Sequence, residues 1–155
     1  MKKLLMILGI IFIVILVWLS SFIFSLYLDY NKSKKYVEEA VQSVIPEWNL
    51  DELKGRMHPE VIKKIPDDQF LEKFNFFRRN FIHLQSYGEI EGEVNKTDEG
   101  YIIGVYKIPL TFENTSAEAT ITVQKVDYGW TITYFTIKST ANLKRSLNNI
   151  KTSPI

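Results

Sequence analysis

The chain has 155 residues, with 19 Lys and Arg against 18 Asp and Glu, so its formal net charge is +1 at pH 7. A near-neutral chain lacks the basic excess that nucleic-acid binding uses, and we exclude nucleic acid as a partner. The sequence contains no cysteine, which excludes disulfides and lipid attachment at a cysteine. Packing alone must therefore hold the fold, and ten Phe, eight Tyr and three Trp residues suit a well-filled core.

The first element is an apolar run over residues 4–28, which begins at Leu4, ends at Leu28 and contains no charged residue. As a helix it would be about 37 Å long, enough to cross a hydrocarbon core of about 30 Å with some tilt. It is longer than the core of a cleaved signal peptide, and no small-residue cleavage pattern ends it. We predict an uncleaved transmembrane anchor that contacts membrane lipid. Because the stub that carries Lys2 and Lys3 is short, we expect a single-pass cell-membrane protein whose C-terminal domain lies outside the cytoplasm.

Helical spacing of apolar residues follows the apolar run. A helix with one apolar stripe is predicted over residues 31–44, and Pro46 should end it. A short helix begins at Asn49, where Glu52 lies at capping-box spacing, and His58 with Pro59 starts a further turn. The clearest helix covers residues 66–84 and places four phenylalanines on one side: Phe70, Phe74, Phe77 and Phe81.

After Gly88 the apolar period changes from about 3.6 to about 2, which is typical of strands. Strands are predicted over residues 89–94, 102–112, 117–126 and 130–138, and the short turns between them indicate an antiparallel meander. In the last strand, a bulge near Thr133 and Tyr134 would place four large side chains on the core side: Trp130, Ile132, Phe135 and Ile137.

Helices first and strands second predict an α+β fold, in which about three helices pack on a curved four-stranded antiparallel sheet. We assign residues 1–30 to the anchor and its stub, residues 31–140 to an α+β extracytoplasmic domain and residues 141–155 to a flexible C-terminal tail. In the tail, Leu143, Leu147 and Ile150 have the spacing of one or two amphipathic helical turns.

Three stretches carry a family resemblance: Leu53 with His58-Pro59-Glu60, residues 81–92 around Leu84-x-Ser86-Tyr87-Gly88, and residues 129–139, which open with Gly129-Trp130-x-Ile132. With the order of helices and meander, they resemble the nuclear transport factor 2-like or cystatin-like superfamily over about residues 36–140. More narrowly, the chain looks like a small bacterial membrane-tethered domain of unknown function in that class. The resemblance implies a cone-shaped fold with room for a pocket between helix and sheet, and it implies no particular activity.

No catalytic signature stands out in the sequence. It has no Ser-His-Asp or Cys-His arrangement and no glycine-rich phosphate loop, and its two histidines, His58 and His83, lie where predicted helices begin and end. We therefore predict no enzyme activity, no catalytic residue, no cofactor and no metal site. Six aromatic residues are the expected lining of a pocket between helices and sheet: Phe70, Phe74, Phe77, Tyr106, Trp130 and Tyr134.

Glu89, Glu91 and Glu93 project from one face of a predicted strand and form a candidate surface for a protein partner. The alternative interpretation is a solvated strand face whose charges discourage edge-to-edge pairing. The leading functional hypothesis is a non-enzymatic interaction or scaffold module, such as an envelope scaffold, presented on the membrane anchor. The alternative is a small-ligand or lipid sensor that uses the pocket between the helices and the sheet.

Overall fold

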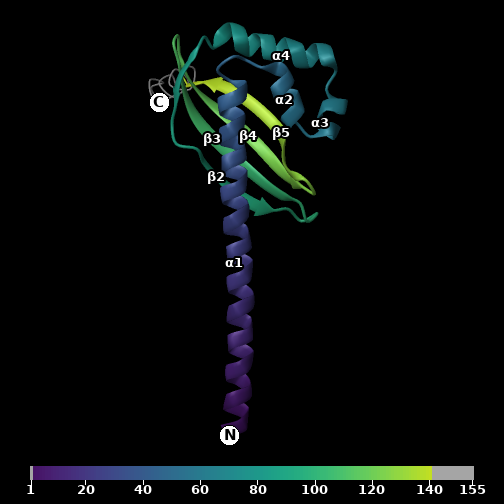
Figure 1. Ribbon diagram of the computed structural model, residues 1–155, viewed down its shortest axis with the longest axis vertical. Helices are drawn as coiled ribbons and strands as arrows, with labels where there is room; N and C mark the ends of the chain where they lie inside the picture. Colours follow the sequence, from purple (N-terminus) through teal and green to yellow (C-terminus); the bar gives the residue numbers. More distant parts are fainter. Residues whose placement is uncertain (1, 141–155) are drawn as a thin grey trace, which may run out of the picture.

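The computed structural model describes the backbone of residues 2–140, and the side chains of that range except those at positions 2–6, 8, 22, 23 and 26. α1 (Lys2–Val44) is one continuous helix, and its N-terminal part extends well beyond the rest of the fold (Figure 1). The helix predicted over residues 31–44 is its C-terminal part, and the apolar stripe there is buried as predicted. The predicted flexible tail over residues 141–155 lies outside the described residues.

The predicted transmembrane anchor is not supported. Within the part of the chain whose side chains are described, no helix combines the length and the apolar character needed to cross a bilayer. The fold class is therefore corrected to an α+β fold without an assigned membrane span, and the single-pass, signal-anchor description is withdrawn with it.

The two short helices begin at the predicted capping residues. Before α2 (Leu50–Arg56), the Asn49 Oδ1 accepts a hydrogen bond from the Glu52 backbone N–H at 3.0 Å. Before α3 (Pro59–Lys64), the His58 Nδ1 accepts one from the Glu60 N–H at 3.2 Å. Each side chain satisfies a backbone donor that the first helical turn leaves unpaired, so the local sequence determines where both helices begin.

The predicted end of the phenylalanine-rich helix at residue 84 is wrong. α4 (Asp67–Asn80) stops at Asn80, and Phe81 has an extended backbone with φ −120° and ψ 95°. The Asn114 side chain accepts from the Ile82 N–H at 3.1 Å and donates to the Asn80 carbonyl at 2.8 Å. A residue more than 30 positions away thus satisfies the backbone groups at the end of the helix, and helical periodicity alone does not reveal it.

The sheet has five strands and not the predicted four: β1 (Leu84–Tyr87), β2 (Glu91–Lys96), β3 (Ile102–Phe112), β4 (Ser116–Val126) and β5 (Gly129–Ser139). All pairings are antiparallel, and β1 and β2 both pair with β3, where Tyr87 faces Leu110 and Glu91 faces Lys107. The two strands thus form one edge that is broken opposite Pro109, whose carbonyl accepts from the Gly88 N–H at 2.8 Å. Proline has no backbone N–H to donate, which suits the position where the ladder is interrupted.

The predicted bulge in the last strand is confirmed. Thr122 faces Tyr134 and Val123 faces Ile132, so Thr133 is the extra residue of β5. The extra residue reverses the face of the sheet to which the following side chains of β5 point. As a result, three side chains of the predicted core set are buried, Trp130, Ile132 and Ile137, and Phe135 is partly buried against the same core.

All helices that cover the sheet do so on one face. Tyr106 and Phe112 have the same parity in β3; Tyr106 contacts Ser33 of α1, and Phe112 stacks on Trp48, which also contacts Phe74 of α4. The core therefore lies between this face and the helices (Figure 1). The opposite face of β3 is exposed at alternate residues over most of its length.

Candidate functional site

The interior between α4 and the sheet is organised around Trp48, a residue that the sequence did not single out. Trp48 lies in the turn after α1 and has a positive φ of 50°. Its ring contacts the rings of Phe74, Phe81 and Phe112 at centroid distances of 5.8, 6.3 and 6.1 Å, and its Nε1–H donates to the Phe81 carbonyl at 3.0 Å. Helical and strand periodicity cannot identify such a residue because it lies between elements.

The predicted pocket between helices and sheet is only a small cavity of about 120 Å³. Three of the predicted lining residues border it, Phe70, Phe74 and Tyr134. Phe77 instead packs on Trp48 and Phe135 at centroid distances of 6.2 Å. Typical small-molecule sites have about 300–1,000 Å³, so this space is too small for one.

Besides Phe77, two further members of the predicted pocket set do not border this cavity: Trp130, which is 9% exposed, and Tyr106, which is fully buried beside α1. Two glycines make room for the Tyr106 ring. A Cβ at Gly92 would lie 2.4 Å from its Cδ1, and a Cβ at Gly104 would lie 2.7 Å from its Cε2. Any larger residue at either position would collide with the ring, so both glycines serve the placement of one tyrosine.

The Tyr106 hydroxyl belongs to a buried polar group between α1 and the sheet. It lies 2.5 Å from the Ser33 Oγ, and the Ser33 hydroxyl itself donates to the Asp29 carbonyl oxygen at 2.7 Å. Either hydroxyl can be the donor in the bond between Ser33 and Tyr106, because the Tyr106 hydroxyl also has an acceptor in the Tyr30 carbonyl at 3.4 Å. Burial raises the pKa of Tyr106 above its ordinary value, so the phenol stays neutral.

One turn earlier in α1, the Asp29 carboxylate receives a charged partner from β4. The Lys125 Nζ lies 2.7 Å from the Asp29 Oδ1, and the side chain of Asp29 is 5% exposed. The Asp29 Oδ2 is buried without a hydrogen-bond partner among the described residues. We call Asp29, Ser33, Tyr106 and Lys125 the α1–sheet clamp. Asp29, Ser33 and Tyr106 are buried, whereas the Lys125 side chain is partly exposed; the arrangement suits positioning of α1 against the sheet.

The predicted acidic surface is only partly formed. Glu91 and Glu93 are exposed in β2, whereas Glu89 lies in the connection before it. Glu91 is opposite Lys107 and Glu93 is opposite Val105 in the neighbouring strand. Since a lysine stands beside the glutamates, the surface is less negative than the sequence suggests, and it is hollowed only by an open groove of about 300 Å³.

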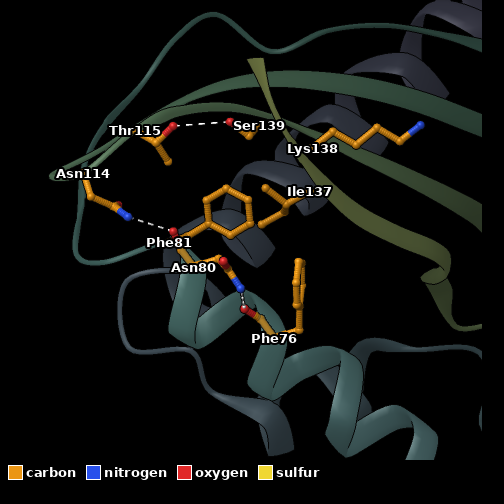
Figure 2. A pocket seen from close by; sticks show the side chains of 8 residues that line it. All are labelled: Phe76, Asn80, Phe81, Asn114, Thr115, Ile137, Lys138 and Ser139. Carbon is orange, nitrogen blue, oxygen red and sulfur yellow. Dashed lines mark hydrogen bonds between the residues drawn. The ribbon is translucent and has the colours of Figure 1, made fainter. Parts of the chain in front are cut away.

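A larger open groove, which the sequence did not predict, lies at the end of α4. Its volume is about 590 Å³, and we call it the α4–β5 groove; its lining is Phe76, Asn80, Phe81, Asn114, Thr115, Ile137, Lys138 and Ser139. Figure 2 shows the Phe76 ring pointing from α4 toward Ile137 of β5, while Lys138 points away from the groove. Phe76 is 53% exposed. The groove therefore offers an apolar floor with a rim of amide and hydroxyl groups.

Neither histidine takes part in a reactive cluster. His58 caps α3 through its Nδ1, and the Nδ1 of His83 lies 3.1 Å from the Glu113 Oε2 on the surface. Within residues 2–140, no group of three or more metal-ligating side chains is close enough to hold an ion.

Comparison with known proteins does not assign a family. No family model, no curated protein and no solved structure matches this chain. The resemblance to the nuclear transport factor 2-like or cystatin-like superfamily therefore stays a prediction.

Proposed function

We propose that this chain is a non-enzymatic interaction module, which presents its α+β domain to a protein partner and contacts membrane lipid through exposed apolar side chains of α1. The proposal of a protein partner rests on the small size of the cavity between α4 and the sheet, about 120 Å³. A filled interior leaves the outer surface as the place where recognition occurs. It also weighs against a ligand sensor that uses this cavity, because the cavity is below the usual size of a small-molecule site.

The apolar surface of α1 supports the lipid contact. Its large hydrophobic residues between Ile7 and Leu28 whose side chains are described are exposed, with Phe12 at 62% and Val14 at 61%. A contiguous apolar surface of this kind marks an interaction site in a folded protein. Two of the polar groups within it are satisfied inside the helix, because the Ser20 and Ser21 hydroxyls donate to carbonyls four residues earlier at 2.7 and 3.0 Å. The proposal concerns contact with lipid and assigns no membrane span.

The continuity of α1 supports presentation of the domain. One helix carries both the exposed apolar residues and the buried stripe that packs on the sheet, with no loop between them. The α1–sheet clamp lies where the helix meets the sheet. A lipid-bound α1 would therefore hold the domain in a defined orientation, and the expected extracytoplasmic location stays a prediction.

Flotation with phosphatidylcholine vesicles tests the lipid contact of the full chain. We expect the chain to float with the vesicles and the triple variant Ile10→Ser/Phe12→Ser/Val14→Ser to lose at least tenfold in the floated fraction. The matched control, Leu71→Ser/Tyr128→Ser, removes apolar side chains that are exposed elsewhere, at 47% and 76%. Equal flotation of both variants would contradict a specific role for α1.

Affinity purification of the full chain from mild detergent, at native expression level, tests the partner. We expect a protein complex of fixed stoichiometry that is weakened by Glu91→Lys/Glu93→Lys and unchanged by Glu72→Lys, an exposed glutamate of α4. Recovery of the monomer alone would argue against the interaction module. Native mass spectrometry of the same sample covers the ligand-sensor alternative, which would need a co-purifying small molecule.

A further inference from the structure

The two edges of the sheet differ in their protection against pairing with another strand. One edge is divided between β1 and β2 and is interrupted opposite Pro109. In β2 it carries three exposed charged residues, Glu91, Glu93 and Lys96. The other edge is β5, which is 11 residues long and pairs with no strand except β4 within residues 2–140. Since short strands and charge are the usual protection of an edge, β5 is the edge left open to a further strand.

The chain itself already pairs with the first part of this edge, beside α2 and α3 (Figure 1). The His58 N–H donates to the Ile132 carbonyl at 2.8 Å, and Met57 forms a parallel bridge with Ile132. After the bulge at Thr133, no described segment other than β4 bonds to the backbone of residues 134–139. We call this stretch the β5 edge. An edge strand leaves alternate N–H and C=O groups unpaired, so the β5 edge can accept one more strand beyond the Met57 bridge.

The cavity between α4 and the sheet lies beside the start of the β5 edge. Tyr134 and Phe135 of β5 line it together with apolar side chains of α2, α3 and α4, among them Leu53, Val61 and Phe74. Tyr134 is 50% exposed and Leu53 is buried, so the cavity reaches from the surface into the core. An apolar cavity of about 150 Å³ accepts a benzene molecule. A cavity of about 120 Å³ therefore has room for one branched aliphatic side chain.

Lys73 is the one charged residue among the described residues that line the cavity. Its exposed side chain forms no ion pair with a described residue, and no acidic residue lies three or four positions away on α4. The neighbouring Lys54 and Lys63 differ from it, because the Nζ of each lies 2.9 Å from a carboxylate oxygen. The cavity therefore presents an unpaired positive charge that a carboxylate would complement.

We propose that the β5 edge and the cavity bind an extended acidic segment of a partner protein. The segment adds to β5 as a further strand, inserts one branched aliphatic side chain into the cavity and places a carboxylate near Lys73. Main-chain hydrogen bonds then provide affinity, and the cavity provides specificity. Because side chains two positions apart in a strand lie on the same face, the acidic residue belongs two positions from the aliphatic one.

This inference rests on the proposed function for the existence of a protein partner, and it uses a surface separate from Glu91 and Glu93. The purification described above tests whether a partner exists and whether it contacts those glutamates. A binding experiment with peptides tests the β5 edge without the native partner. Failure of one proposal is therefore distinguishable from failure of the other.

Selection of a phage-displayed random peptide library, with peptides of about ten residues, on the full chain in mild detergent tests the site. We expect the enriched peptides to carry a branched aliphatic residue two positions from an acidic residue. The tightest peptide should bind about tenfold more weakly to Val61→Phe, which fills the cavity, and about threefold more weakly to Lys73→Gln. The matched controls, Val105→Phe and Lys107→Gln, change exposed residues on the opposite face of the sheet and should leave the affinity unchanged. Absence of enriched peptides, or equal affinity for the cavity variants and their controls, would overturn the proposal.

N-methylation of the selected peptide tests strand pairing without changing the protein. In a strand that adds to an edge, only alternate N–H groups point toward that edge. Methyl groups on one alternate set should weaken binding by about tenfold or more, and methyl groups on the other set should have little effect. Equal effects of the two sets would rule out strand addition. A dimer of the chain in the same detergent that is lost in Val61→Phe would show that a second copy occupies the site, which also contradicts the proposal.

Discussion

Lys125→Met tests whether the α1–sheet clamp holds α1 in place. The substitution keeps an unbranched side chain of similar length but removes the ammonium 2.7 Å from the Asp29 Oδ1. The carboxylate, whose side chain is 5% exposed, then has no described partner for either oxygen. Breaking a buried ion pair costs about 3–5 kcal/mol. Because the Lys125 side chain is 42% exposed, water recovers part of this, and we expect a loss of about 2–3 kcal/mol.

Urea unfolding of the full chain in non-ionic detergent measures this loss, with near-ultraviolet circular dichroism of the Trp48 cluster as the signal. The matched comparison is a double-mutant cycle with Asp29→Asn, because the neutral amide does not need the ammonium. We expect the double variant to be more stable than Lys125→Met alone. A loss below about 0.5 kcal/mol for Lys125→Met, or a coupling energy near zero, would refute the clamp.

Four further substitutions test the packing of the domain and the buried tyrosine. Gly92→Ala places a Cβ 2.3 Å from the Val105 carbonyl oxygen, so urea unfolding should show a loss of about 3 kcal/mol. Gly55→Ala, which meets nothing within 4 Å, should stabilise the chain by up to about 1 kcal/mol in the same assay. Trp48→Ala removes the centre of the aromatic interior and should cost about 3–5 kcal/mol, whereas a loss below about 1 kcal/mol would contradict the assigned packing. For Tyr106, burial raises the pKa of the phenol above its ordinary 10.0, so the folded state retains the proton longer than the unfolded state. The stability this proton provides is complete below pH 10 and is lost as the pH rises through the higher folded value. Tyr106→Phe should therefore flatten the fall in stability above about pH 10, and an unchanged slope would contradict the raised pKa.

Local sequence signals predicted the elements that depend on neighbouring residues. The cap at Asn49 needs only a backbone donor three residues later, and the bulge at Thr133 follows from the parity of the apolar residues within one strand. The α+β class follows from the order of helical and strand periods. In each case the interacting groups are close in sequence, so the pattern contains the information.

The wrong helix boundary and the wrong strand count have a different cause, which is contact between residues that are far apart in the sequence. The end of α4 depends on Asn114, and the break between β1 and β2 depends on Pro109 in another strand. The predicted pocket set mixed residues that border the cavity with Tyr106, which two distant glycines direct toward α1. The α4–β5 groove was missed because its lining comes from α4, the β3–β4 turn and the end of β5.

The sequence by itself determined the α+β class, the helix starts and the parity of the strands, since capping and periodicity act over a few residues. Only the tertiary structure decided how full the interior is, which polar groups join α1 to the sheet, and where the open groove lies. Those properties depend on the distances between side chains from separate elements, which are set when the sheet and helices pack together. A sequence pattern specifies which face of a helix or strand a residue is on, but it does not specify how closely the helices and the sheet approach each other.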